Sequence, residues 1–278
     1  MSVFEKIVHS LQTTMQRPTL YGTFHIVALI IAFAIAAFLV WKFKDAKDKT
    51  LRRLLLVIWV VITLFEVYKQ LVFSLSVDEF MNATWRFQWF SFPFQFCSTP
   101  LYLMPILIFA KEGKFRNAIT AYMATFSLFA GLIVMFYPST VFVNYIGINI
   151  QTMVHHGMQI AVGVLLVAHN RHHLNKRFFA WSVMVFTALC VIALIFNIVV
   201  QNALIASGSD QVVNMFYISP YISSELPVFS TIYPLVPYPV FFMIYLLGFS
   251  LVALIIYAAE KGIVKLCSYI KHKNEKTA

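Results

Sequence analysis

Charged residues are scarce in this 278-residue chain, and their scarcity indicates its class. Only 12% of the residues are charged, whereas 60% are hydrophobic and the mean hydropathy is +0.79. A soluble domain carries about twice that charged fraction. The composition therefore excludes an ordinary soluble domain. It predicts an all-α polytopic membrane protein made of a single membrane domain over residues 1–278.

Cysteine is also scarce. Cys97, Cys190 and Cys267 are odd in number, scattered and without CxxC spacing, so they predict neither a disulfide framework nor a zinc site. The first 20 residues show no cleavable signal pattern, and the first apolar run is long enough to span a membrane. Acidic residues are outnumbered by basic ones, and the formal net charge is +10. Because the basic residues flank the apolar runs, we expect no nucleic-acid partner.

Seven long apolar stretches make up most of the chain. A hydrocarbon core of ~30 Å needs about 20 apolar residues in helical form. We expect seven transmembrane helices near residues 24–41, 54–75, 92–110, 118–137, 150–168, 178–200 and 236–259. A proline-containing loop over residues 202–237 is expected to cover the outer mouth of the bundle. No internal repeat is visible, which argues against an inverted-repeat transporter.

Loop charges predict the orientation. Of the 21 Lys and Arg residues, 17 lie in residues 42–53, 111–116, 171–177 and the basic tail 261–278. Basic loops stay on the cytoplasmic side of a membrane. We therefore expect the N-terminus outside and the C-terminus in the cytoplasm.

Most polar residues inside the apolar stretches share one depth near the outer end. On the expected spans they lie roughly 7–9 Å below the outer boundary, with Glu66 one turn deeper. Ionisable and amide groups in hydrocarbon are costly and are usually paired, buried and functional. The shared depth predicts one outward-opening pocket formed by His25, Glu66, Lys69, Gln70, Cys97, His155, His156 and Asn197.

Glu66, Lys69 and Gln70 stand at positions i, i+3 and i+4 and so share one helix face. Two interpretations stand. The three residues form a buried ion pair that fixes the helix orientation, or Lys69 contacts an anionic headgroup or carboxylate while Glu66 keeps it charged.

Cys97 lies between two prolines, Pro93 and Pro100, which free backbone groups near it. It is either a small apolar core residue or a nucleophile activated by a nearby cation or helix N-terminus. Similarly, His155 and His156 either lie at the interface or bond to a carbonyl, or one of them is a general base. Adjacent helical residues point about 100° apart, so we expect one of the two to face the pocket.

A metal site built from His25, Glu66 and a histidine is a further alternative. No HxxxH or HxxE spacing supports it. We expect neither a metal nor a cofactor, and we interpret Cys190 as a core residue.

Three segments resemble those of a known family. Residues 92–98, Phe-Pro-Phe-Gln-Phe-Cys-Ser, resemble an L-P-L-H-L-C segment, and His155-His156-Gly157 lies early in the fifth span. Residues 214–220, Asn-Met-Phe-Tyr-Ile-Ser-Pro, and 236–239, Val-Pro-Tyr-Pro, resemble an N-Y-M-Y-L…P segment followed by G-P-W-P. The chain thus resembles the YwaF-like bacterial integral membrane proteins, relatives of the eukaryotic transmembrane-protein-164 acyltransferases.

The resemblance implies a multi-pass protein of the bacterial cell membrane that transfers fatty acyl groups of phospholipids, with Cys97 as the acyl-accepting nucleophile. We therefore expect an acyltransferase or another lipid-modifying enzyme whose pocket opens outward. Its partners would be membrane lipids or acyl chains. His156 or His155 would relay protons, and Asn214 or Gln95 would polarise the acyl carbonyl. The remaining pocket residues would bind substrate: Lys69, Glu66, Gln70, His25 and Asn197.

Gln95 stands where the family motif has a histidine, so a base would have to come from elsewhere. The alternative function is a non-enzymatic transporter or lipid or small-molecule binding protein that uses the same pocket.

Overall fold

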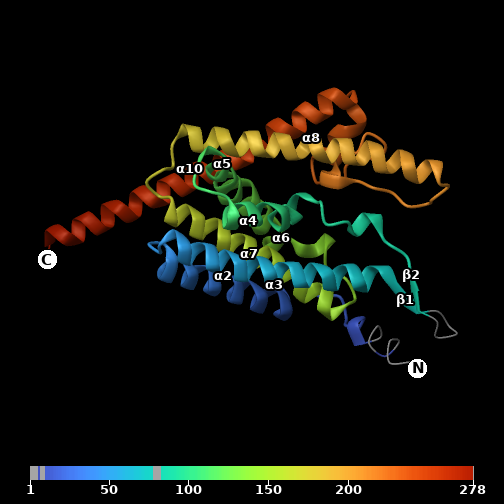
Figure 1. Ribbon diagram of the computed structural model, residues 1–278, viewed down its shortest axis with the longest axis horizontal. Helices are drawn as coiled ribbons and strands as arrows, with labels where there is room; N and C mark the ends of the chain where they lie inside the picture. The colour runs from blue at the N-terminus through green and yellow to red at the C-terminus, as the bar shows by residue number, and fades with distance from the viewer. Residues whose placement is uncertain (1–5, 7–9, 78–82, 278) are drawn as a thin grey trace.

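The computed structural model describes residues 6, 10–77 and 83–277 as a bundle of helices (Figure 1). Within these residues, six helical stretches are long and apolar enough to cross a membrane. They are α2 (Thr23–Phe43), α3 (Asp48–Ser74), the stretch Lys114–Phe136, α7 (Ile146–His169), α8 (Lys176–Ala206) and α10 (Tyr238–Thr277). These helices confirm the prediction of an all-α, multi-pass membrane protein.

Shorter elements connect the spans. The stretch Lys114–Phe136 consists of α5 (Lys114–Tyr122), the π-helical turn η3 (Met123–Ser127) and α6 (Leu128–Phe136). β1 (Leu75–Val77) pairs antiparallel with β2 (Ala83–Trp85). The remaining elements are η1 (Trp89–Ser91), η2 (Phe96–Ser98), α4 (Pro100–Phe109), η4 (Pro138–Thr140), η5 (Met215–Tyr217), α9 (Phe229–Ile232) and η6 (Tyr233–Leu235).

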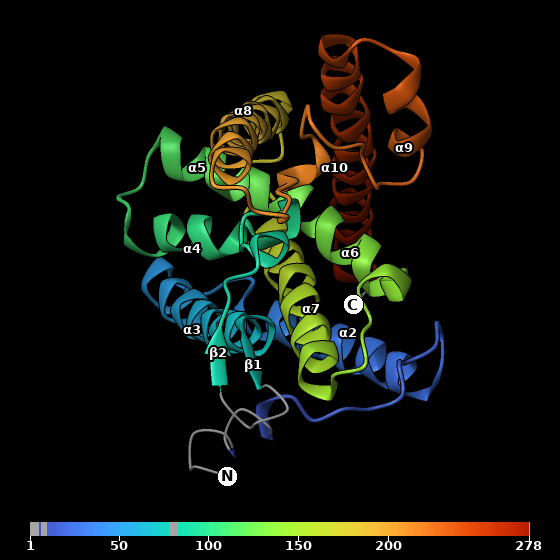
Figure 2. The same cartoon turned by 90° about the vertical axis from the view of Figure 1, so that its right-hand side faces the viewer.

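Helix α7 lies at the centre of the bundle, where α2, α3 and α6 contact it (Figure 2). In the most apolar window of each span, 78% of the α7 residues and 72% of the Lys114–Phe136 residues are buried. The corresponding values for α2, α3, α8 and α10 are 22–28%, so most residues in these four windows are not buried inside the bundle. A polar side chain on α7 therefore lies inside protein, as buried intramembrane polar groups usually do.

The third predicted span, residues 92–110, forms a shorter helix than the sequence suggested. α4 has only 10 residues and begins at Pro100, so it rises ~15 Å, half of a hydrocarbon core. Proline lacks the N–H that a preceding turn would need, which favours it at the first position of a helix. Only the 3-10 turn η2 extends the helical stretch before Pro100, to Phe96–Phe109, and a seventh spanning helix is not confirmed.

The two ends of the bundle differ in chemistry. We call the end with residues 75–99, 137–145 and 207–237 the aromatic end, and the end with residues 44–47, 110–113 and 170–175 the basic end. The last turns of α10 extend past the basic end (Figure 1). The long loop begins at Ser207, since α8 continues to Ala206, and the basic tail is the helical end of α10 up to Thr277. The orientation in a membrane stays a prediction.

Candidate functional site

A cluster of polar side chains lies between α3, α7 and the 3-10 turn η2 that precedes α4. We define the polar cluster as Glu66, Lys69, Cys97, His155, His156 and Gln159. Lys69 Nζ lies 2.9 Å from Glu66 Oε1, and the two side chains are only 17% and 7% exposed. Gln70 Nε2 donates to the same carboxylate oxygen at 2.7 Å and to the Ser91 carbonyl at 2.7 Å. The expected ion pair on one face of α3 is therefore present and buried.

The main chain of Cys97 is held by two side chains of α7. His155 Nε2 donates to the Cys97 carbonyl oxygen at 2.9 Å, and Gln159 Nε2 donates to the same oxygen at 2.8 Å. Backbone outside a regular helix keeps its polar groups inside a membrane protein only where protein partners satisfy them. Helix α4 begins only at Pro100, so the Cys97 carbonyl depends on partners from another helix. His155 and Gln159, one turn apart on α7, are those partners.

Two imidazole lone pairs remain in the polar cluster. A carbonyl oxygen only accepts, so His155 carries a proton on Nε2, and His156 carries one on Nδ1, which donates to the Thr152 carbonyl at 2.7 Å. The opposite nitrogens, His155 Nδ1 and His156 Nε2, are buried and have no hydrogen-bond partner among the described residues. Both histidines therefore keep a free nitrogen, where the sequence suggested that one would face the pocket.

The other buried atoms without a partner in the cluster are also acceptors. Glu66 Oε2 and Gln159 Oε1 make no hydrogen bond within the described part of the chain. Buried polar atoms normally find a partner, and each exception calls for an explanation. Four free acceptors close to a thiol make the cluster suited to groups that donate a proton, such as a thiol or a hydroxyl.

Cys97 lies in the electrostatic field of this cluster. Cys97 is a half-buried residue, and its thiol interacts with the charges of Lys69 and Glu66 and with the Ser98 side chain. On the loop at the aromatic end, burial, and then the charges that Cys97 and Glu225 can carry, raise the pKa of Tyr217 to about 12. The Tyr217 phenol thus keeps its proton at neutral pH.

Several predicted binding residues hold backbone segments. Gln95 Oε1 accepts from the Phe216 N–H at 2.9 Å, and Gln95 Nε2 donates to the Asn214 carbonyl at 3.0 Å. Asn197 bonds to both the N–H and the carbonyl of Met215, at 2.7 and 2.9 Å. These bonds fasten the long loop at η5 to the segment before α4 and to α8.

The fastened loop is strained. Phe216 and Tyr217 have φ values of +58° and +57°, in the left-handed region that non-glycine residues rarely adopt. Each such residue costs about 1–3 kcal/mol and persists only where its surroundings enforce it. The Tyr245 hydroxyl donates to the Phe216 carbonyl at 2.8 Å and, together with Gln95, holds the Phe216 main chain in this conformation.

The side chains of His25 and Asn214 also form hydrogen bonds with main-chain groups. His25 Nδ1 accepts from the Tyr21 N–H at 2.9 Å, and its Nε2 donates to the Met135 carbonyl at 2.7 Å. Asn214 bonds to the Ser219 N–H and the Ser223 carbonyl. The structure therefore brings Glu66, Lys69, Gln70, Cys97, His155 and His156 together, and places His25, Asn197, Gln95 and Asn214 in supporting positions.

Gln159 is a member of the cluster that the sequence reasoning did not select. Its signal was its position four residues after His155, which places both side chains on one face of α7. Within residues 6, 10–77 and 83–277, no group of three or more His, Cys, Asp or Glu side chains could hold a metal ion.

The apolar helices and their buried polar cluster define an all-α, multi-pass membrane protein whose polar side chains meet inside the bundle. The model of the TMEM164 family matches residues 20–259, which include every residue of the cluster. The chain belongs to the TMEM164 family. No curated protein and no solved structure matches it. The narrower likeness to YwaF-like bacterial proteins stays a prediction.

Proposed function

We propose that this protein is an integral membrane enzyme that transfers acyl groups between lipids, with Cys97 as the nucleophile. One observation carries the proposal. α7 holds the Cys97 main chain through His155 and Gln159, beside a buried lysine and two imidazole lone pairs. A thiol, a base and a third group that orients them are the elements of covalent acyl transfer.

In the first step the Cys97 thiol gives its proton to an imidazole nitrogen, and the sulfur attacks the carbonyl carbon of a lipid ester. The C–S bond forms, the ester C–O bond breaks, and the departing lipid oxygen takes the proton from the imidazolium. In the second step an acceptor hydroxyl gives its proton to the imidazole and its oxygen attacks the thioester. The C–S bond breaks, and the thiolate recovers the proton.

Two lone pairs compete for the role of base, His155 Nδ1 and His156 Nε2. His155 is already tied to the Cys97 carbonyl, so its ring stays beside the nucleophile. The Lys69 ammonium has three N–H donors, and its ion pair with Glu66 uses one of them. The others can donate to the phosphate or to the acyl carbonyl oxygen of a lipid. Gln95 and Asn214 are bonded to the backbone, so the proposal gives them no role in polarising the carbonyl.

An apolar groove supports a lipid substrate. A cavity of about 360 Å³ lies between α2 and α7 and is lined mainly by aliphatic residues such as Ile31, Ile35 and Met158. Gly157, next to His156, also lines it, and Ala32 packs there so closely that a Cβ on Gly157 would approach its methyl group to 3.0 Å. An acyl chain could lie in this groove and reach α7 at the level of the histidines. The membrane would be the bacterial cell membrane, with the aromatic end outside.

Acyl labelling tests the proposal. The purified protein is incubated with a phospholipid whose acyl chain carries an alkyne, and hydroxylamine-sensitive labelling is measured. We expect labelling of the wild type and none of Cys97→Ala. Cys190→Ala and Cys267→Ala are matched controls, because these thiols are buried in α8 and exposed on α10, and both should label normally.

The alternative function, lipid or small-molecule binding without chemistry, has one observation in its favour. His155 bonds to the carbonyl of Cys97 rather than to its thiol. If undiminished labelling survives Cys97→Ala, or if the wild type binds the lipid without labelling, the acyl-transfer proposal fails and the binding function takes its place. Where labelling depends on Cys97, His155→Asn and His156→Asn are tested separately, and the variant that slows labelling more identifies the base.

A further inference from the structure

A second cavity opens at the basic end of the bundle, at the opposite end from Cys97. Its volume is about 640 Å³. Buried leucines form its floor, among them Leu55, Leu107 and Leu166, and its walls are polar. The proposed acyl transfer uses none of its residues, so the cavity calls for a separate explanation.

Three helices begin at this cavity. α3 begins at Asp48, α5 follows Gly113, and α8 follows Asn175, and all three of these residues line it. The first N–H groups of a helix point out of its N-terminus, and together they carry about half a positive charge. Such ends stabilise anions, and phosphate groups above all.

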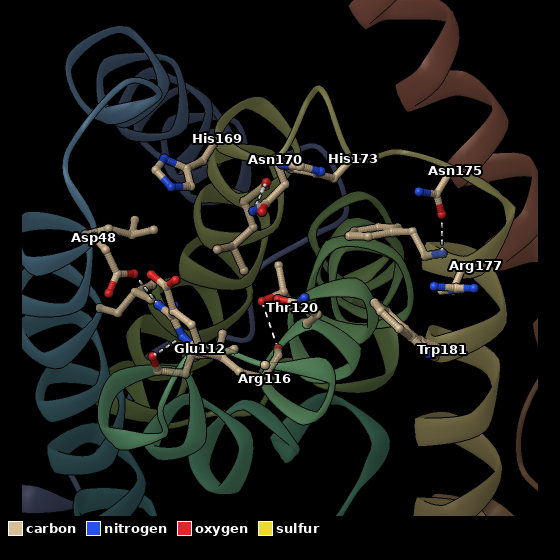
Figure 3. A pocket seen from close by; sticks show the side chains of 17 residues that line it. Asp48, Glu112, Arg116, Thr120, His169, Asn170, His173, Asn175, Arg177 and Trp181 are labelled. Carbon is tan, nitrogen blue, oxygen red and sulfur yellow. Dashed lines mark hydrogen bonds and ion pairs between the residues drawn. The ribbon is translucent and has the colours of Figure 1, made fainter.

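The side chains divide the cavity into two halves (Figure 3). On one side Arg116 bonds to Asp48 at 2.6 Å and to the Leu107 carbonyl at 3.0 Å, with Glu112 beside it. Arg52 also contacts Asp48, so that carboxylate is already neutralised. The acidic residues of the cavity are therefore confined to the Arg116 side.

The opposite side carries a guanidinium without a protein partner. Arg177 lies in the first turn of α8, is exposed at the cavity and makes no ion pair or hydrogen bond to another described residue. Among the other arginines of the described chain only Arg53, which does not line the cavity, also lacks such a partner. Trp181 stands one turn further along α8, and His173 and Asn170 line the wall above (Figure 3). An unpaired guanidinium, a helix N-terminus and an indole face together suit an anion attached to an apolar body.

We propose that this cavity binds the phosphate group of an amphiphilic ligand, with Arg177 as its charge partner and the leucine floor and Trp181 against its apolar part. Arginine recognises phosphate through two parallel N–H donors. The phosphate belongs either to a membrane lipid headgroup or to a soluble phosphate compound. Lipid is drawn from the leaflet at the basic end, and a soluble phosphate enters from the water on that side.

Native mass spectrometry of the full-length protein in detergent tests the proposal. The probes are phosphatidic acid, the matching diacylglycerol without phosphate, and inorganic phosphate as competitor. We expect phosphatidic acid to bind and diacylglycerol not to bind. Arg177→Ala should weaken binding about 10- to 100-fold, the effect of losing a charge-assisted hydrogen bond, and Arg177→Lys should restore part of it.

Arg53→Ala is the matched control. Arg53 is an exposed arginine near the same end that does not line the cavity, and its loss should leave binding unchanged. Equal loss in both variants, or equal binding of diacylglycerol, would overturn the proposal. Competition by inorganic phosphate assigns the site to a soluble phosphate, and its failure assigns the site to a lipid headgroup. A thermal unfolding curve like that of the wild type shows that Arg177→Ala is folded.

Discussion

Removing the Gln95 side chain should release the long loop from the site. Gln95→Ala leaves the Phe216 N–H and the Asn214 carbonyl without the partners that hold them. An unsatisfied buried group costs about 1–3 kcal/mol, so the two together cost about 2–6 kcal/mol. The left-handed backbone at Phe216 and Tyr217 adds to the tendency to open, because its strain is relieved when the loop detaches.

Hydrogen exchange measures this release directly. Since 1.4 kcal/mol corresponds to a tenfold change, the open population around residues 213–219 should rise at least about 30-fold. Gln95→Glu should have an intermediate effect, because it keeps an acceptor for the Phe216 N–H and loses the donor to Asn214. Gln16→Ala, at an exposed glutamine, is the matched control and should exchange like the wild type.

The reasoning would be refuted by an unchanged exchange rate at residues 213–219 in Gln95→Ala. It would also be refuted if exchange rose equally throughout the bundle, since that would indicate global destabilisation rather than release of one loop. Acyl labelling of the same variant shows whether acyl transfer needs the fastened loop.

Three further perturbations test the packing around the cluster. Glu66→Gln leaves the mostly buried Lys69 ammonium without its counter-charge and should lower the free energy of unfolding by about 3–5 kcal/mol. Adding Lys69→Met should recover part of this loss. A double variant whose loss equals the sum of the two single losses would contradict a buried pair. Gly131→Ala places a Cβ 2.9 Å from the His156 carbonyl oxygen and should lower the free energy of unfolding by about 1–3 kcal/mol. In Gly262→Ala on α10 the added Cβ meets nothing within 4 Å, so this control should be as stable as the wild type. Equal stability losses in the two variants would exclude a tight contact between α6 and α7. The Tyr217 pKa of about 12 exceeds the usual value of 10.0, so its contribution to stability is present below pH 10 and is lost as the pH rises toward 12. The melting temperature of the wild type should therefore fall relative to that of Tyr217→Phe between pH 10 and pH 12. A constant difference between the two melting temperatures would contradict the raised pKa.

Much of the architecture could be predicted from composition and periodicity. Long apolar runs must form helices in hydrocarbon, because only a helix satisfies its own backbone there. The helices over residues 23–43, 146–169 and 176–206 accordingly lie where the sequence indicated. The segment before Pro100 was the exception, because hydropathy does not reveal that neighbouring side chains of α7 can replace the hydrogen bonds of a broken helix.

The candidate site was predictable in part. Glu66, Lys69 and Gln70 share a face by helical spacing alone, so their contacts follow from local sequence. The role of Gln95 did not follow, because its partners lie about 120 residues further along the chain. Pairings at that separation depend on how the helices pack, and no local pattern records them.

The sequence by itself determined a multi-pass helical membrane protein, because the cost of polar groups in hydrocarbon acts on each residue wherever it stands; the shared depth of its polar residues stays a prediction. Only the tertiary structure decided which of those residues meet. In the packed bundle His155 and Gln159 donate to the Cys97 carbonyl, whereas His25 and Asn197 form hydrogen bonds with other main-chain groups. A hydrogen bond needs a partner within about 3 Å, and only the packing of the helices brings these partners that close.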